Sequence, residues 1–194
     1  MASYELTFNG LMVLFLLMVF LAMPGTAARL HGMASTTNNG EDLITTTCNN
    51  TLYFDECVCS LRSDPWSETA DINGLAAIAL NLSITEAMKI LPFIINLNNT
   101  LAVSDPQTEF ESRCLGECIG EYLEAVEYLQ EATQALTDKS YDEVNRLVTD
   151  AMTDSVTCED GFAEGPDGHS PFTHTNQYFE KLCSILLAIT KLLT

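Results

Sequence analysis

Residues 115–136 read LGECIGEYLEAVEYLQEATQAL and contain the clearest periodicity in the chain. Mostly apolar side chains recur in alternating steps of four and three residues, at Leu115, Ile119, Tyr122, Val126, Leu129, Thr133 and Leu136. Since an α-helix turns by about 100° per residue, these positions lie on one stripe. Carboxylates occupy the opposite side, at Glu117, Glu121, Glu124, Glu127 and Glu131. The pattern predicts a long helix that packs against other helices along its apolar stripe.

Three further segments have the composition of bundle helices. Residues 72–97 are apolar over a wide face, and Pro92 predicts a kink within them. Residues 141–158 and 176–193 each carry an apolar stripe. The stripes comprise Val144, Val148, Ala151 and Cys158 in the first segment, and Phe179, Leu182, Leu186, Ile189 and Leu193 in the second. We therefore predict an all-α fold, an up-down-up-down four-helix bundle over residues 70–194.

Local signals mark where two of these helices begin. Ser104 stands three residues before Gln107 with Pro106 between them, which predicts a helix start at Ser104. Ser140 and Glu143 have the spacing of a capping box, directly after a short turn at residues 138–139. The glycines and prolines of residues 160–173 predict the longest internal loop.

The N-terminal part of the chain has the layout of an exported protein. An uninterrupted apolar run spans residues 11–23, which is shorter than the ~20 residues that a membrane-spanning helix needs. Small residues follow at 25–28, so we predict a signal peptide over residues 1–28. Residues 29–42 are predicted to form a flexible leader, and residues 43–66 a short helical arm. We expect a secreted protein with no membrane attachment after the signal is removed.

The charge balance narrows the choice of partners. The chain has 27 acidic and 8 basic residues, which gives a net charge of −19 at pH 7. Nucleic acid is disfavoured because phosphate recognition needs clustered Lys and Arg. Pectin, itself a polyanion, is also a poor direct ligand. A protein partner with a basic or polar surface suits this charge better, and we expect the chain itself to be a monomer or a weak dimer.

Two pairs of cysteines are placed to form disulfides, which are the default after export. Cys118 lies 20 residues before Asp138, and Cys158 lies 20 residues after it. A tight turn between antiparallel helices would bring these two positions to the same height, so a bridge between them is geometrically natural. Cys48 and Cys57, nine residues apart, can close a small hairpin in the arm.

The chain contains three more cysteines. Cys183 lies on an apolar stripe and is expected to be a buried free thiol. Cys59 and Cys114 either form a third bridge that docks the arm or remain unpaired. No metal site and no cofactor are expected, because Cys57-Val58-Cys59 lacks a second close Cys or His pair. N-glycosylation sequons occur at Asn49, Asn81 and Asn98, which fits a secretory route.

Four motifs in order resemble the plant invertase and pectin methylesterase inhibitor family. They are Cys48-x8-Cys57 followed by Ser60-Leu61, ADINGLA at 70–76, Cys118-x3-Tyr122, and DSVTCEDGF at 154–162. Residues 154–162 and 187–193 are especially similar to plane-tree pollen proteins described as invertase inhibitors. The resemblance covers residues 43–194 and implies a four-helix bundle with an N-terminal helical arm.

The resemblance also implies a disulfide pattern. It joins Cys48 to Cys57 and Cys118 to Cys158, and it leaves the position of Cys183 often unpaired. Cys59 and Cys114 are departures from the family pattern.

The resemblance implies a function as an inhibitor that occludes the active-site cleft of a cell-wall carbohydrate enzyme in a 1:1 complex. It also implies a location in the apoplast or cell wall rather than in the vacuole. Family members that block pectin methylesterase use a polar, acidic bundle face. The matching positions here are Tyr122, Glu124, Glu127, Thr157 and Asp160. Members that block acid invertase commonly carry a Pro-Lys-Phe motif where this chain has the residues YDE at 141–143. The glutamates could equally form an ordinary solvated helix face.

The sequence lacks the motifs of the common catalytic classes. There is no G-x-S-x-G, no H-E-x-x-H and no glycine-rich phosphate loop after a strand. His31, His169 and His174 lie in the predicted leader or loop segments. Paired carboxylates for glycoside hydrolysis need a cleft, which an amphipathic helix face does not offer. We therefore expect no enzymatic activity; the competing hypothesis is a secreted helical-bundle signalling or structural protein without an enzyme target.

Overall fold

The computed structural model describes residues 42–166 and 168–194, and within them it contains helices and loops but no strand. The predicted signal peptide and all but the last residue of the predicted leader lie outside these ranges. The arm comprises α2 (Leu43–Cys48), α3 (Phe54–Arg62) and the 3-10 helix η1 (Pro65–Glu68). The long helices are α4 (Ile72–Thr100), α5 (Pro106–Thr137), α6 (Tyr141–Phe162) and α7 (Thr173–Thr190), and the 3-10 helix η2 (Lys191–Leu193) ends the chain. The all-α class is thus confirmed.

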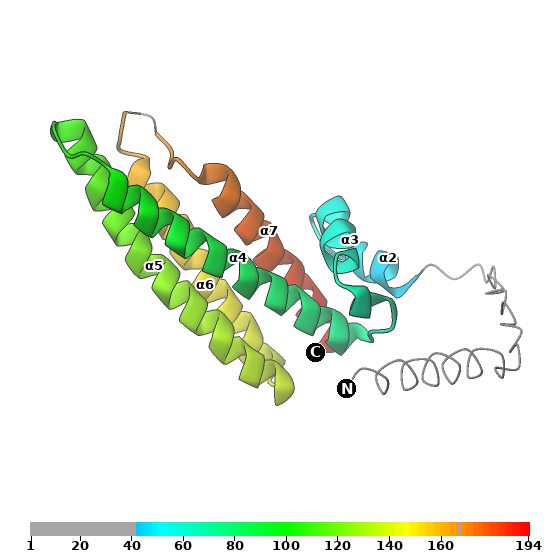
Figure 1. Cartoon of the computed structure of the whole chain (residues 1–194). Helices are drawn as coiled ribbons and strands as arrows, with labels where there is room; N and C mark the ends of the chain where they lie inside the picture. The colour runs from blue at the N-terminus through cyan, green and yellow to red at the C-terminus, as the bar shows by residue number, and fades with distance from the viewer. Residues whose placement is uncertain (1–41, 167) are drawn as a thin grey trace, which may run out of the picture. The chain divides into compact units, whose positions relative to one another are not determined.

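Each of the four long helices packs against two others (Figure 1). α4 contacts α5 and α7, and α6 contacts the same two helices. The residues between these helices form one apolar core, whose largest fully buried members include Leu75, Ile90, Leu115, Leu129, Phe179 and Leu186. The inward residues predicted for α6 and α7 are buried, apart from the half-buried Leu193.

α4 is the most apolar of the four helices. It begins after Asp71, whose carboxylate accepts the N–H of Gly74 at 2.8 Å, and it continues through Pro92 to Thr100. Its length and composition would suffice to cross a membrane, but core helices of helical bundles pass the same test. Here one side of α4 is buried against α5 and α7.

α5 begins one residue later than the sequence signals predicted. The capping residue is Asp105, not Ser104, and its Oδ1 accepts the N–H of Gln107 at 3.0 Å and of Thr108 at 2.9 Å. The Thr108 hydroxyl reaches back to the Asp105 N–H at 3.2 Å and completes a capping box. The reason is Pro106: the residue before a proline favours the extended backbone that an N-cap needs, and Asp105 adopts it.

The turn between α5 and α6 lies where it was predicted, but α6 is not capped by the predicted residues. Lys139 adopts a left-handed conformation (φ 56°), and the N–H of Ser140 donates to the carbonyl of Ala135 at 2.9 Å, which is the Schellman way of ending a helix. The Ser140 side chain makes no capping bond, so the predicted capping box is absent. The Glu143 carboxylate instead pairs with Arg146.

The buried stripe of α5 is rotated relative to the predicted one. Thr133 is exposed, and Ile119, Val126 and Leu136 are only half-buried. The fully buried positions are Leu115, Cys118, Tyr122, Ala125, Leu129 and Ala132. The buried side turns toward small residues because α5 packs against both α4 and α6, and alanines at the interface let helices approach closely.

Two disulfides join Cys48 to Cys57 and Cys118 to Cys158. The Cα atoms of the second pair are 4.7 Å apart. Cys183 is a buried free thiol. The optional third bridge is absent: Cys59 is exposed on α3, whereas Cys114 is buried on α5 and directs its thiol to the carbonyl of Gly161 at 3.2 Å.

The arm is held to the bundle mainly through α7 and α4. Lys181 of α7 forms an ion pair with Glu56 of α3, and its ammonium lies 5.4 Å from the ring centroid of Tyr53. The Ser60 and Tyr178 hydroxyls lie 3.4 Å apart. Cys59 belongs to α3, which packs on α4 and α7, whereas Cys114 belongs to α5. The packing of the arm therefore keeps these two cysteines apart.

Candidate docking face on α5 and α6

The five residues predicted to bind a target do not share one environment. Glu124 and Glu127 are exposed on α5, and Thr157 and Asp160 are exposed on α6. Tyr122 is completely buried, so its assignment to an exposed face is wrong. The physical reason is its place in the α5 heptad: position 122 lies one turn after Cys118, whose disulfide fixes that side of the helix against α6.

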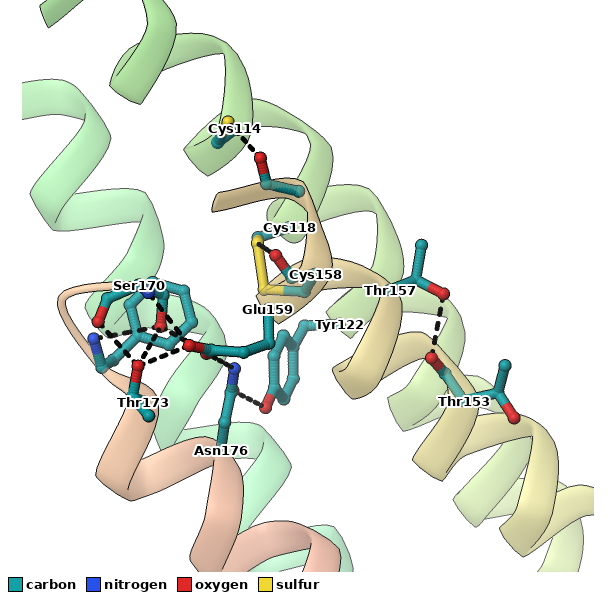
Figure 2. Close-up of a disulfide and its surroundings, with 12 residues drawn as sticks. Cys114, Cys118, Tyr122, Thr153, Thr157, Cys158, Glu159, Ser170, Thr173 and Asn176 are labelled. Atoms are coloured by element: carbon teal, nitrogen blue, oxygen red, sulfur yellow. Dashed lines mark hydrogen bonds between the residues drawn. A yellow bond between two sulfur atoms is a disulfide. The ribbon is translucent and has the colours of Figure 1, made fainter. Parts of the chain in front are cut away.

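Tyr122 belongs to a buried polar network that the sequence did not reveal (Figure 2). Its hydroxyl donates to the Oδ1 of Asn176 on α7, and the amide of Asn176 donates to Glu159 on α6 at 2.7 Å. The ring of Tyr122 packs against Phe179 with centroids 5.8 Å apart. Burial removes water from the hydroxyl and raises the pKa of Tyr122 far above its usual value. The tyrosine therefore acts as a neutral hydrogen-bond donor that ties α5 to α7.

Glu159 is the centre of this network. Oε1 accepts the backbone N–H of Ser170 at 3.0 Å and the Thr173 hydroxyl at 2.5 Å. Oε2 accepts the Ser170 hydroxyl at 2.6 Å and the Asn176 amide at 2.7 Å. Burial alone would raise the pKa of Glu159, but these hydrogen bonds together outweigh it and lower the pKa below its usual value. An ionised Glu159 thus fixes the end of α6 to the following loop and to the start of α7.

A second group of carboxylates lies on the outer side of α5 and α6. We call Glu121, Glu124, Asp150 and Asp154 the carboxylate cluster. Burial, then the negative charges of Glu121, Glu124 and Asp150, raise the pKa of Asp154 to about 6. The Oδ2 atom of Asp154 is buried and has no hydrogen-bond partner in the described part of the chain. The carboxylate cluster therefore holds like charges close together without a compensating cation on Asp154.

The acidic surface continues toward the loop end of α6. Glu117 lies beside Gly161, where an added Cβ would be 3.8 Å from its Oε2. Burial, then Glu159 and Asp160, raise the pKa of Glu180 on α7. The charge of Asp160 therefore acts on Glu180 of α7, whereas the charge of Glu124 acts on Asp154 of α6. Thr157 projects from the side of α6 opposite to Glu159, with its hydroxyl bonded to the carbonyl of Thr153 at 3.0 Å (Figure 2).

This arrangement is suited to contact rather than to chemistry. The side chains that carry it, Glu124, Glu127, Thr157 and Asp160, are exposed on the outside of helices. Among residues 42–166 and 168–194, no three His, Cys, Asp or Glu side chains gather in an arrangement that could hold a metal ion. What this surface offers is negative charge on a rigid, disulfide-linked pair of helices. Such a surface favours binding to a protein surface of complementary charge.

Comparison with known proteins decides the family. Residues 42–189 match the family model described as "Plant invertase/pectin methylesterase inhibitor". The chain belongs to this family. A protein of Platanus acerifolia named "Putative invertase inhibitor" is 41% identical over 140 residues, which cover 72% of this chain and 75% of that protein. "Cell wall / vacuolar inhibitor of fructosidase 2" of Arabidopsis thaliana is 31% identical over 150 residues, covering 77% of this chain and 78% of that protein.

Solved structures of the family agree with the fold. A crystal structure of a pectin methylesterase inhibitor from Arabidopsis, in a mutant form, superposes with a TM-score of 0.66. The superposition covers 79% of this chain and 99% of the crystallised chain. The two sequences are 22% identical, so the likeness concerns the fold alone. The family model and the two relatives are named as inhibitors of enzymes, which agrees with the expectation that this chain is not itself an enzyme.

Sequence reasoning missed the residues that hold the end of α6 in place. Asn176 precedes Phe179 by three residues, so it lies on the apolar stripe of α7. A polar residue on such a stripe indicates a buried, hydrogen-bonded side chain, and this signal could have identified Asn176. Nothing in the sequence indicated that Glu159 would be its partner, because the other donors are Ser170 in the loop and Thr173 at the first position of α7.

Proposed function

We propose that this inhibitor-family member is secreted and blocks a plant cell-wall carbohydrate enzyme, either pectin methylesterase or acid invertase. It binds in a 1:1 complex and covers the active-site cleft with the acidic outer surface of α5 and α6. The observation that carries the proposal is the set of exposed carboxylates on a rigid helix pair, Glu124 and Glu127 with Asp160. Their charge attracts a basic or polar enzyme surface and can compete with sugar acids or hydroxyls for the cleft.

Rigidity supports this assignment. The disulfide between Cys118 and Cys158 joins the two helices close to the end of α6, next to Thr157. Glu159 anchors the end of α6 from the inside, directly beside Asp160. A surface that is already ordered loses little conformational freedom on binding, so more of its contact energy appears as affinity.

Each of the two targets has an observation in its favour. Pectin methylesterase is favoured by the acidic face and by the absence of a Pro-Lys-Phe motif at residues 141–143. Acid invertase is favoured by the 41% identity to the Platanus protein named as an invertase inhibitor. The family includes proteins named for either enzyme, so membership leaves both targets in place.

The test is a side-by-side titration of the oxidised protein into both enzymes at mildly acidic pH. We expect stoichiometric loss of activity for one of them. The double substitution Glu124→Lys with Glu127→Lys should abolish inhibition and keep the helical circular dichroism spectrum. The matched control, Asp55→Lys with Glu68→Lys on the arm, changes the net charge equally and should inhibit like the native chain. Inhibition of neither enzyme contradicts the proposal.

A further inference from the structure

One side of α4 presents a partly exposed apolar stripe. Ile84, Met88, Leu91 and Ile95 follow one another at steps of four, three and four residues, and Pro92 lies beside them. Met88 is 55% exposed and Ile95 is 37% exposed, whereas Ile84 and Leu91 are half-buried and pack partly against the core. We call these five residues the α4 stripe. Soluble proteins seldom leave such a contiguous apolar surface without a function for it.

The α4 stripe differs from the rest of this acidic chain in charge. Between residues 72 and 100 the only charged residues are Glu86 and Lys89, and they pair with each other at 3.2 Å. The chain as a whole carries a net charge of −19. The charged side chains that keep other surfaces of the protein solvated are therefore missing along this helix.

One glycosylation sequon precedes the α4 stripe and another follows it, and both continue its helical spacing. Asn81, in Asn81-Leu82-Ser83, lies three residues before Ile84, and Asn98, in Asn98-Asn99-Thr100, lies three residues after Ile95. The alternation of three and four residues thus runs unbroken from Asn81 to Asn98, which places both on the side of the stripe. Asn81 is exposed and Asn98 is half-buried.

The side chain of Asn98 contacts α5 through its amide oxygen. Its Oδ1 accepts a hydrogen bond from the Ser112 hydroxyl at 3.1 Å. This bond does not engage the amide nitrogen, which is the atom that carries an N-linked sugar.

Asn81 stands at the edge of a groove between α4 and α5. The groove has a volume of about 500 Å³, within the range of sites that hold small organic ligands. Its lining combines apolar side chains such as Ala77, Ile84 and Leu136 with polar ones such as Thr133 and Lys139. Sugar rings likewise combine apolar C–H faces with polar hydroxyls, so the first rings of a glycan on Asn81 suit this mixed lining.

We infer that N-linked glycans on Asn81 and Asn98 cover the α4 stripe, the glycan of Asn81 entering the α4–α5 groove. In the transfer, the amide nitrogen bonds to C1 of the first sugar, the bond from C1 to the phosphate of a lipid diphosphate-linked oligosaccharide breaks, and the amide loses one proton. Ser83, the hydroxyl residue of the first sequon, is fully buried and bonded to the carbonyl of Ala79. Glycosylation of Asn81 must therefore precede the packing of α4.

The inference rests on export, which is part of the proposed function. The experiment uses the full chain, expressed in a plant secretory host and recovered from the medium. Mass spectrometry of peptides, with and without enzymatic deglycosylation, measures occupancy at each sequon. Fluorescence of an apolar dye and the elution volume on size exclusion are then compared for Asn81→Gln, Asn98→Gln, the double substitution and the control Asn49→Gln, which changes the sequon on the arm.

We expect occupancy at Asn81 and Asn98, and a severalfold rise in dye fluorescence with self-association for the double substitution but not for Asn49→Gln. Circular dichroism of each variant should match the native spectrum. Secreted protein with Asn81 unmodified overturns the inference, and so does a dimer that forms through an unmodified α4 stripe. An unchanged dye signal in the double substitution also overturns it. Failure to appear in the medium contradicts export, whereas failed inhibition by the glycosylated protein contradicts only the proposed inhibitory function.

Discussion

Replacing Glu159 by Gln tests whether the buried network holds the docking face together. The native carboxylate accepts four hydrogen bonds, two on each oxygen. The amide of Gln keeps the shape of the carboxylate but turns one acceptor into a donor. If its nitrogen takes the place of Oε1 it meets the N–H of Ser170, and if it takes the place of Oε2 it meets the amide of Asn176. Hydroxyls can rotate to accept, but the backbone N–H of Ser170 cannot. The amide of Asn176 can accept only by turning over, which removes the acceptor of the Tyr122 hydroxyl.

The expected cost follows from this mismatch. Hydrogen bonds to a charged group contribute about 1.5–3 kcal/mol each, and at least one is lost without replacement. We therefore expect Glu159→Gln to lower the free energy of unfolding by about 2–3 kcal/mol at neutral pH. The neighbouring substitution Asp160→Asn, at an exposed position, should change it by less than about 0.5 kcal/mol. Urea unfolding with the disulfides intact measures both.

The pH dependence gives a second, independent signature. The pKa of Glu159 is lowered in the folded protein, so its stabilisation is present above the unfolded pKa and is lost as pH falls through the folded pKa. The difference between native chain and Glu159→Gln should consequently shrink on acidification. A difference below about 1 kcal/mol at neutral pH, or one that stays constant into the acid range, would refute the role assigned to this carboxylate.

Three further changes probe other parts of the structure. The pKa of Asp154 is raised to about 6 in the folded protein, so ionisation of this carboxyl opposes folding as the pH rises from about 4 to about 6. Asp154→Asn should therefore stabilise the protein by about 1–2 kcal/mol above pH 6, after allowance for solvent screening, and by almost nothing near pH 4. Urea titrations at the two pH values measure this difference. Replacing both Cys118 and Cys158 by Ala opens a loop of 40 residues and should cost about 4 kcal/mol by the chain-entropy estimate, measured by the same unfolding assay. Lys181→Ala removes the ion pair with Glu56 and should speed proteolytic release of the arm, measured by limited digestion against the native chain.

The helices were predictable because their signals are local or periodic. The bridge from Cys118 to Cys158 follows from equal distances to a turn at Asp138, which needs only helix geometry. The capping residues at the starts of α5 and α6 were harder to predict from the sequence. Asp105 and Ser104 are both good capping residues, and the backbone restriction imposed by Pro106 decides between them. At Ser140, a Schellman turn and the Glu143–Arg146 pair replace the capping box.

The site was predictable only on its exposed side. Glu124 and Glu127 follow from the polar side of the α5 pattern. The error at Tyr122 arises because family position alone does not state which way a side chain points, and the α5 periodicity itself placed Tyr122 inward. The Glu159 network joins α5, α6, α7 and a loop, so it depends on tertiary contacts that no single segment encodes. Asp154 is similar, since its raised pKa comes largely from burial and from charges on α5.

The central claim is that the outer surface of α5 and α6 enters the cleft of the target enzyme. Carboxylate labelling followed by peptide mass spectrometry, performed with and without pectin methylesterase or acid invertase, measures this directly. We predict that the enzyme that is inhibited reduces labelling of Glu124, Glu127 and Asp160 and leaves Glu68 on the arm unchanged. Protection of Glu68 with unchanged labelling of the α5 and α6 carboxylates would contradict the account.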